Sequence, residues 1–298
     1  MFFILNKLII LTIPLLPKFF VKIFANKYVA GIKTSEAIDI VKKLNQNNLS
    51  CTLDILGEHT KSKNESNAIA NKYVDIFEKL GQNKLDCNIS VKPSHIGSDV
   101  NNKVLSNNIK KLIDAAKKNN NFLRIDMEDS NLTDLSISIY REKFEKKSHI
   151  GIVLQAYLKR TEKDIENLDS FSNIRLCKGI YNEDKSISFK NPIDINKNYL
   201  KLLNKALEKN IYVGIATHDQ KLIKSCLKII ESKKINKKNI EFQMLYGVPM
   251  DSTIKKLMSQ NFKIRIYVPY GKNWYEYSIR RIKENPNISK YIIKNLFK

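Results

Sequence analysis

The sequence predicts an α/β fold, a (β/α)8 barrel of the TIM type. Eight short apolar runs resemble strands, segments with helical periodicity separate them, and each repeat of about thirty residues has the size of a βαβ unit. Eight such units in about 250 residues indicate a closed barrel rather than an open sheet. No G-x-G-x-x-G turn follows the first strand, which disfavours a dinucleotide-binding domain.

The composition is that of a globular protein, with 43% hydrophobic and 28% charged residues among 298. A net charge of +22 would ordinarily indicate nucleic acid or an anionic membrane as a partner. The lysines, however, are spread along the whole chain together with abundant asparagine and isoleucine, so we predict no nucleic-acid partner. The four cysteines lack C-x-x-C spacing, which indicates buried thiols in a reducing compartment and no metal site.

The chain begins with an apolar stretch, residues 1–24, that lysines and prolines interrupt. The uninterrupted run is about ten residues, short of the roughly 20 that a membrane-spanning helix needs. A signal peptide is disfavoured because there is no basic leading region and no clear A-x-A site. We therefore expect residues 1–33 to form a helical arm that packs on the protein or lies on an anionic membrane surface. Residues 34–298 are expected to form one barrel domain.

The predicted elements follow in order along the chain. Thr34, Ser35 and Glu36 form a capping signal for a first helix over residues 34–44. Strand-like runs follow over residues 51–56, 87–92, 122–128, 149–157, 174–178, 212–217, 240–245 and 263–268. Helix-periodic segments lie over residues 67–80, 101–118, 132–147, 161–168, 198–207, 220–232 and 253–260.

Nearly every predicted strand ends in a polar or aromatic residue that a purely structural strand would not need. In a barrel these ends meet at one rim, where the active sites of this fold lie. Any single one is better explained as a cap or turn residue, but eight in register predict a site. The residues are Asp54, Lys92, Asp126, Gln155, Lys178, Thr217, Gln243 and Tyr267.

The last strand continues into residues 265–286, RIYVPYGKNWYEYSIRRIKENP, which break at Gly271 and then fit a helix. On that helix Tyr277, Arg280, Arg281 and Glu284 share one face. Adjacent guanidinium groups match a carboxylate with parallel hydrogen bonds, and tyrosines can contact the apolar part of the same ligand. The alternative is a solvated basic helix.

Three other strand ends carry charged groups. Arg175, Lys178 and Gly179 could meet phosphate or an electron-rich ring, or could face solvent as a basic strand end. His218 opens the next helix, either as a cap-region residue or as a donor to a cofactor. Lys92 is expected to form an ion pair with Asp126 on the neighbouring strand.

The residues resemble those of the proline dehydrogenase family over about residues 27–287. Each matching stretch is moderately specific, and together, in family order, they are strong. Besides residues 265–286, they are LDILGE at 53–58, ISVKPSHIG at 89–97, LRIDMEDS at 123–130, GIVLQAYLKRT at 151–161, RLCKGIY at 175–181, ATHD at 216–219 and EFQMLYG at 241–247.

The resemblance implies a monofunctional enzyme that oxidises L-proline to Δ1-pyrroline-5-carboxylate by hydride transfer from C5 to N5 of FAD. It also implies a distorted barrel whose eighth helix lies over the carboxyl ends of the strands. Electrons would pass to a membrane quinone, and the protein would be cytoplasmic, with a peripheral contact at the inner face of the membrane as an option. Two alternatives stay open: a dehydrogenase of hydroxyproline or another cyclic amino acid, and a non-catalytic basic barrel that binds membrane or nucleic acid.

Site residues carry over one by one as implications of the resemblance. Asp126 and Arg175 resemble the catalytic pair, with Asp126 supporting Lys92 and Arg175 lying near flavin N5. The substrate residues would be Lys92, Arg280 and Arg281 for the carboxylate and Leu245, Tyr267 and Tyr277 around the ring. The FAD contacts would be Met127, Gln155, Arg175, Lys178, Gly179, Ile180, Thr217 and His218. The chain departs from the family pattern at Ile180, where alanine is more usual, and at Asp219, where asparagine is common.

Overall fold

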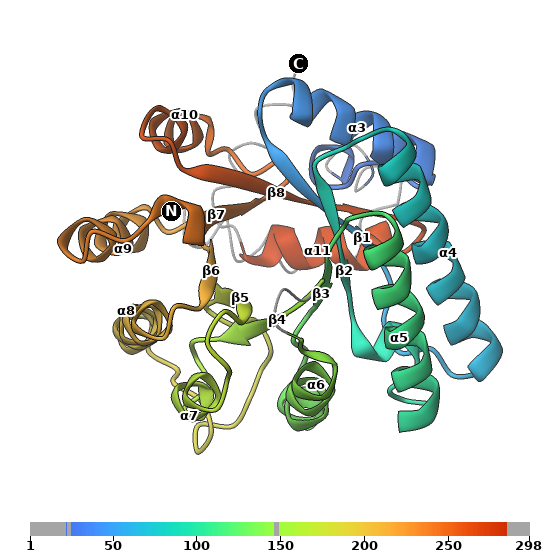
Figure 1. Ribbon diagram of the computed structural model, residues 1–298, viewed down its shortest axis with the longest axis horizontal. Coiled ribbons are helices and arrows are strands. Elements are labelled where there is room, and N and C mark those ends of the chain that lie inside the picture. The colour runs from blue at the N-terminus through green and yellow to red at the C-terminus, as the bar shows by residue number, and fades with distance from the viewer. Residues whose placement is uncertain (1–21, 23–24, 146–148, 285–298) are drawn as a thin grey trace, which may run out of the picture.

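Eight parallel strands close into a barrel in chain order, each paired with the next and β8 paired with β1 (Figure 1). The computed structural model describes residues 22, 25–145 and 149–284. The predicted (β/α)8 fold is confirmed. The strands are β1 (Ser50–Ile55), β2 (Cys87–Val91), β3 (Leu123–Ile125), β4 (Ile150–Gln155), β5 (Asn173–Cys177), β6 (Tyr212–Ala216), β7 (Ile240–Leu245) and β8 (Lys263–Tyr270).

Helices surround the ring of strands, except for the last one, which crosses the middle of the ring in Figure 1. That last helix, α11 (Trp274–Glu284), contributes side chains to the cavity at the carboxyl ends of the strands, as expected. The others are α3 (Thr34–Gln46), α4 (Lys63–Gln82), α5 (Asn102–Lys118), α6 (Ser130–Lys143), α7 (Thr161–Glu166), α8 (Pro192–Glu208), α9 (Gln220–Ser232) and α10 (Asp251–Ser259). Two short 3-10 turns are η2 (Pro93–Ile96) and η3 (Lys237–Asn239).

Two helices begin earlier than the apolar periodicity predicted, because polar residues start them. Ser62 caps α4 by accepting a hydrogen bond from Glu65 N. Asn191 caps α8, with a proline at its first position. The first residues of both helices are exposed, including Ile193 at 63%, so the buried apolar stripe begins only later in each helix.

The start of α3 differs in detail from the prediction. Lys33, not Thr34, is the residue at the N-cap. The Glu36 carboxylate accepts hydrogen bonds from Lys33 N at 2.7 Å and Ile32 N at 2.8 Å, as a capping-box glutamate does. The Thr34 hydroxyl instead lies 3.2 Å from the hydroxyl of Tyr270, so it ties the helix to β8.

Strand β3 is shorter than predicted: Asp126 N still donates to Val91 O of β2 at 2.8 Å, and the chain beyond it leaves the sheet. The carboxylate of Glu128 accepts hydrogen bonds from Ser94 N at 2.8 Å and Ser94 Oγ at 2.5 Å. The Glu128 side chain therefore holds the first turn of η2, to which Ser94 belongs.

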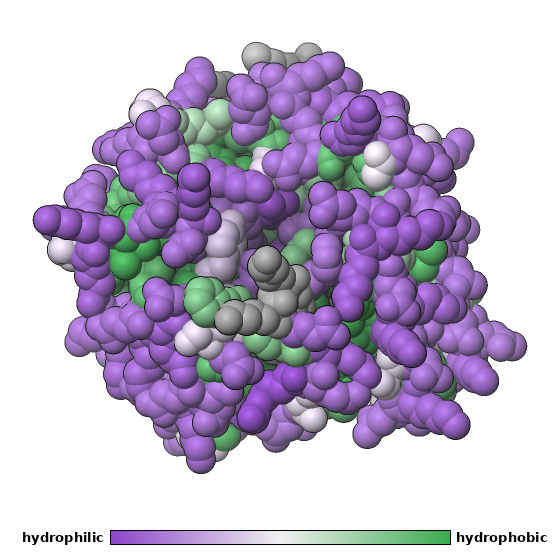
Figure 2. Space-filling view, viewed as in Figure 1, coloured by the Kyte–Doolittle hydropathy of each residue, from purple (hydrophilic) through white to green (hydrophobic). Residues whose placement is uncertain are grey.

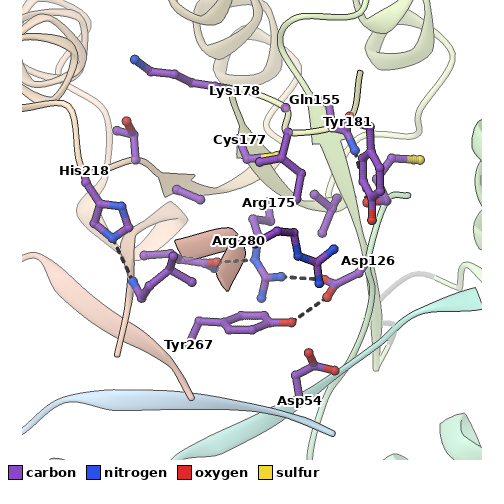
Figure 3. Close-up of a pocket in the computed structure, with 18 of the residues that line it drawn as sticks. Asp54, Asp126, Gln155, Arg175, Cys177, Lys178, Tyr181, His218, Tyr267 and Arg280 are labelled. Atoms are coloured by element: carbon purple, nitrogen blue, oxygen red, sulfur yellow. Dashed lines mark hydrogen bonds and ion pairs between the residues drawn. The ribbon is translucent and has the colours of Figure 1, made fainter. Parts of the chain in front are cut away.

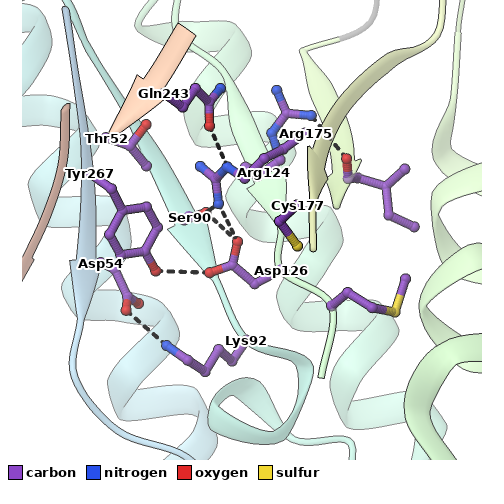
Figure 4. A network of polar contacts seen from close by, with 12 residues as sticks. Thr52, Asp54, Ser90, Lys92, Arg124, Asp126, Arg175, Cys177, Gln243 and Tyr267 are labelled. Atoms are coloured by element: carbon purple, nitrogen blue, oxygen red, sulfur yellow. Dashed lines mark hydrogen bonds and ion pairs between the residues drawn. The ribbon is translucent and has the colours of Figure 1, made fainter. Parts of the chain in front are cut away.

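The interior of the barrel carries a polar network, whereas the main hydrophobic core lies between strands and helices. Thr52 donates to Asn88 at 2.5 Å between β1 and β2, and Arg175 reaches Gln243 and Asp126 across the barrel (Figure 4). Aliphatic layers are usual at such positions. This barrel therefore relies on matched hydrogen bonds along its axis, where an unpaired group would be costly.

The surface is largely hydrophilic on the face shown in Figure 2, with smaller hydrophobic areas between. In the described part of the chain, none of the helices combines the length and hydrophobicity needed to cross a bilayer. The cysteines are free thiols, with Cys51, Cys87 and Cys226 buried. The apolar arm predicted over residues 1–33 lies mostly outside the described residues.

Candidate active site

A cavity of about 640 Å³ opens at the carboxyl ends of the strands (Figure 3). All the strand-end residues predicted from the sequence line it, and so does every other site residue named there. The structure thus brings together residues from every strand and from α11. They are Asp54, Lys92, Asp126, Met127, Gln155, Arg175, Lys178, Gly179, Ile180, Thr217, His218, Gln243, Leu245, Tyr267, Tyr277, Arg280 and Arg281.

The predicted ion pair between Lys92 and Asp126 is wrong. Lys92 Nζ lies 2.8 Å from Asp54 Oδ2, and Asp126 Oδ1 lies 2.7 Å from Arg175 Nη1. Lys92 has an acid on each neighbouring strand, so strand order alone could not choose between Asp54 and Asp126. Burial by itself lowers the pKa of Lys92, but the attraction of Asp54 and Asp126 outweighs it and holds that pKa above its usual value. Lys92 is therefore positively charged.

Asp126 is the centre of a fixed polar cluster (Figure 4). Its carboxylate accepts hydrogen bonds from Ser90 Oγ at 2.7 Å, Arg175 Nη1 at 2.7 Å and the Tyr267 hydroxyl at 2.9 Å. The Arg175 guanidinium also lies 5.0 Å from the centre of the Tyr267 ring. These contacts hold the phenol in one orientation at the wall of the cavity.

Four ion pairs between described residues line the cavity, and two of these pairs join Lys92 to Asp54 and Arg175 to Asp126. Two further pairs join Lys178 to Asp219 at 2.7 Å and Arg280 to Glu58 at 3.4 Å. A cavity lined by several cations suits a ligand with a carboxylate. Among the described residues that line the cavity, the cations are Lys92, Arg175, Lys178, Arg280 and Arg281, and the carboxylates are Asp54, Glu58, Asp126 and Asp219.

Helix α11 presents its predicted face to this cavity. Tyr277 is buried, and the Arg281 guanidinium lies 5.2 Å from the centre of its ring. Arg280 is half-buried beside Glu58. This face of α11 therefore lines the cavity, and the alternative interpretation, a solvated basic helix, is wrong. The Glu284 side chain lies outside the described part of the structure.

The turn after β5 has a backbone that only glycine adopts readily. Gly179 has φ of +108°, and a Cβ there would lie 2.0 Å from a ring carbon of Tyr157. The main chain therefore passes directly over that ring and turns into the cavity. Ile180, which follows, is 58% exposed.

His218 is neutral in the folded protein. Burial lowers its pKa to about 4, and nearby Arg281 adds to the effect. The Leu245 N–H donates to His218 Nε2 at 3.0 Å, so the ring carries its proton on Nδ1. Asp219, not His218, caps α9, through hydrogen bonds from Lys221 N and Leu222 N. The Nδ1–H of His218 is thus a donor at the cavity rather than a helix cap.

The free energy of unfolding should fall as the pH drops from about 6.5 to about 4, because both His95 and His218 have pKa values lowered to about 4 by burial. In that window the unfolded chain binds protons at these histidines and the folded protein does not. Each contributes a slope of about 1.4 kcal/mol per pH unit. Urea unfolding at several pH values measures this slope. His95→Gln should reduce it by about that amount, and an unchanged slope would contradict the assignment.

Several residues of the site were missed or given no role by sequence reasoning. Asp54 appeared only as a strand end, although it is the ion-pair partner of Lys92. Glu58 and Tyr181 follow strands in loops, where no periodicity marks them. The one usable signal was the alternation of side chains along a strand. Asp54 lies two residues after Thr52 on β1, so both side chains are on the inner face of the barrel.

The fold and the cavity define a class of protein, a (β/α)8-barrel enzyme with its active site at the carboxyl ends of the strands. The family model described as proline dehydrogenase matches residues 37–293. The chain belongs to the proline dehydrogenase family, as an oxidoreductase of proline catabolism.

Curated relatives match over most of their length. Proline dehydrogenase 2 of Bacillus subtilis (strain 168) is 32% identical over 278 residues, which cover 93% of this chain and 91% of the relative. The proline dehydrogenase of Deinococcus radiodurans is 32% identical over 280 residues, 92% of this chain and 90% of the relative.

Among solved structures, proline utilization A (PutA) from Bdellovibrio bacteriovorus, inactivated by N-propargylglycine, superposes with a TM-score of 0.82 at 25% identity. The match covers 88% of this chain but 32% of that one, so this chain spans about a third of that longer protein.

Proposed function

We propose that this protein is an FAD-dependent dehydrogenase that oxidises L-proline to Δ1-pyrroline-5-carboxylate and passes the electrons to a membrane quinone. The observation that carries the proposal is the cavity itself, in which Lys92, Arg280 and Arg281 line the same space as an aromatic and aliphatic wall. Family membership supports proline as the substrate.

The carboxylate of proline would bind where Lys92 and the two arginines of α11 face the cavity. Lys92 supplies a compact charge, and Arg280 and Arg281 supply planar forks that match a carboxylate. Asp54 and Glu58 form ion pairs with Lys92 and Arg280 and so hold these two cations at the cavity.

The pyrrolidine ring would lie against Leu245, Tyr267 and Tyr277. Asp126 and Arg175 hold Tyr267 in place, so this wall cannot move aside without losing the hydrogen bond to Asp126 and the contact with the Arg175 guanidinium. An added hydroxyl on C4 would meet the phenol ring, which favours proline over trans-4-hydroxyproline.

The residues present fit a flavin. Among the described residues, Arg175 Nη2 and Gln155 Oε1 are buried polar atoms without a hydrogen-bond partner, so a donor and an acceptor remain for a ligand. FAD, when bound, would accept the hydride from C5 of proline at its N5. The residues proposed to hold it are Met127, Gln155, Arg175, Lys178, Gly179, Ile180, Thr217 and His218.

The visible spectrum of the purified protein tests the proposal. Flavin bands that bleach on addition of L-proline under anaerobic conditions, and return with a short-chain quinone, are expected. Faster bleaching by trans-4-hydroxyproline would favour the alternative substrate. A protein without flavin bands, even after incubation with FAD, would instead favour the non-catalytic basic barrel.

The peripheral membrane contact proposed for residues 1–33 rests on their sequence, since most of them lie outside the described residues. Co-sedimentation with anionic vesicles, with and without residues 1–24, measures it. Binding that is the same for both chains would exclude the arm as the anchor.

A further inference from the structure

A chain of buried hydrogen bonds leads from the far end of the barrel to Arg175. Glu241 on β7 lines a separate cavity at the amino-terminal ends of the strands and does not line the active-site cavity. Its Oε1 accepts hydrogen bonds from Arg265 Nε at 2.8 Å and from Gln243 Nε2 at 2.6 Å. Gln243 Oε1 in turn accepts from Arg175 Nε at 2.5 Å (Figure 4).

The direction of this chain is fixed at both ends, by Glu241 and by Arg175. A carboxylate only accepts hydrogen bonds, so the amide of Gln243 must turn its NH2 group towards Glu241. Its carbonyl oxygen then faces Arg175, which only donates. A flipped amide would place two acceptors together at Glu241 and two donors together at Arg175. Arg265 and the other neighbours hold the pKa of Glu241 near 2 in spite of its burial, so the carboxylate stays ionised.

The neighbouring strand leaves room for this arrangement. Gly214 on β6 stands beside Gln243, and a Cβ there would lie 2.3 Å from Gln243 Nε2. Any larger residue would displace the amide. The members are almost fully buried, with exposed fractions of 1% for Glu241, 4% for Gln243 and 6% for Arg175, so water does not compete for their hydrogen bonds.

We propose that Glu241 is a positioning residue that sets the orientation of the Arg175 guanidinium through Gln243, although it never touches substrate or flavin. Gln243 fixes Nε of Arg175, and Asp126 and Ser90 fix Nη1. These contacts leave Nη2, which has no hydrogen-bond partner among the described residues, as the donor for a ligand. The role rests on the proposed function, in which that ligand is the flavin.

Glu241→Gln tests the role because it keeps the shape of the side chain but replaces an acceptor-only group with one that also donates, so the Gln243 amide is then oriented from the Arg175 side alone. We expect kcat for proline to fall roughly tenfold, as one charge-assisted contact becomes misaligned, with KM changed by less than about twofold. The midpoint potential of the bound flavin should become more negative, because a cation held less firmly beside it stabilises the reduced form less.

The competing explanation is that Glu241 only neutralises buried Arg265. The double variant Glu241→Gln/Arg265→Met removes that unpaired charge and should still show the low kcat and the shifted potential. Full recovery in the double variant would overturn the positioning role. The double variant also keeps the test valid if Glu241→Gln alone folds poorly, because it leaves no unpaired buried charge.

Combining Glu241→Gln with a substitution of Gln243 provides an independent check. Gln243→Met breaks the connection without leaving an unpaired charge, so adding Glu241→Gln to it should cause no further loss of kcat. Fully additive effects would show that Glu241 acts by another route. If the wild-type protein shows no flavin reduction by proline, the proposed function fails; a normal wild type with an equally active Glu241→Gln variant overturns only this role.

Discussion

Arg175→Met should lower kcat for proline oxidation by about 100- to 1,000-fold, the usual cost of removing one preorganised donor from a reacting centre. The Arg175 guanidinium holds Asp126 at 2.7 Å and lies over the Tyr267 ring, and its Nη2 atom is left for the flavin. Methionine keeps much of the volume but none of these hydrogen bonds. Stopped-flow measurement of flavin reduction by proline gives the rate of the affected step.

Two companion variants show whether the loss belongs to the chemistry. Arg175→Lys keeps the charge without the planar fork and should fall between wild type and Arg175→Met. Arg141→Met removes an exposed cation on α6 and should leave the rate unchanged. Flavin occupancy and melting temperature are measured on each sample, since Asp126 loses its buried partner. A fall in kcat of less than threefold at full occupancy would remove Arg175 from the reacting centre.

The fold could be predicted because parallel strands in a barrel are buried on both faces and recur at a regular distance. β1 and β4 are buried throughout, which produced the apolar runs that marked them. The rim could be predicted for the same reason, since the end of each run marks the position where a side chain reaches the cavity. Boundaries were less certain where a polar cap such as Ser62 or Asn191 starts a helix.

The pairing of charges could not be predicted, because it depends on contacts between distant segments. Glu58 and Arg280 are 222 positions apart, and nothing near either residue indicates the other. Lys92 has an acid on each neighbouring strand. Only the three-dimensional arrangement shows that Lys92 pairs with Asp54 and that Arg175 pairs with Asp126. These pairings determine the distribution of charge that a substrate meets in the cavity.

Arg281→Met should raise KM for proline by about 10- to 150-fold, because it removes a charge-assisted contact to the substrate carboxylate worth roughly 1.5 to 3 kcal/mol. Arg281 lines the cavity on α11, and the Tyr277 ring supports its guanidinium at 5.2 Å. The flavin should remain bound, since its proposed contacts come from the ends of β3 to β6. Steady-state kinetics and flavin occupancy on the same sample measure both effects.

The comparison with Arg280→Met separates substrate binding from local charge balance. Arg280 is 41% exposed at its side chain and faces Glu58, so its loss should raise KM less and also leave that carboxylate unpaired. Lys272→Met, just before α11, removes one exposed charge and should change KM by less than about twofold. If Arg281→Met behaves like Lys272→Met at full flavin occupancy, the carboxylate binds elsewhere. The roles proposed for Lys92 and Tyr277 would then fail with it, because Lys92 was placed at the same carboxylate and the Tyr277 ring supports the Arg281 guanidinium.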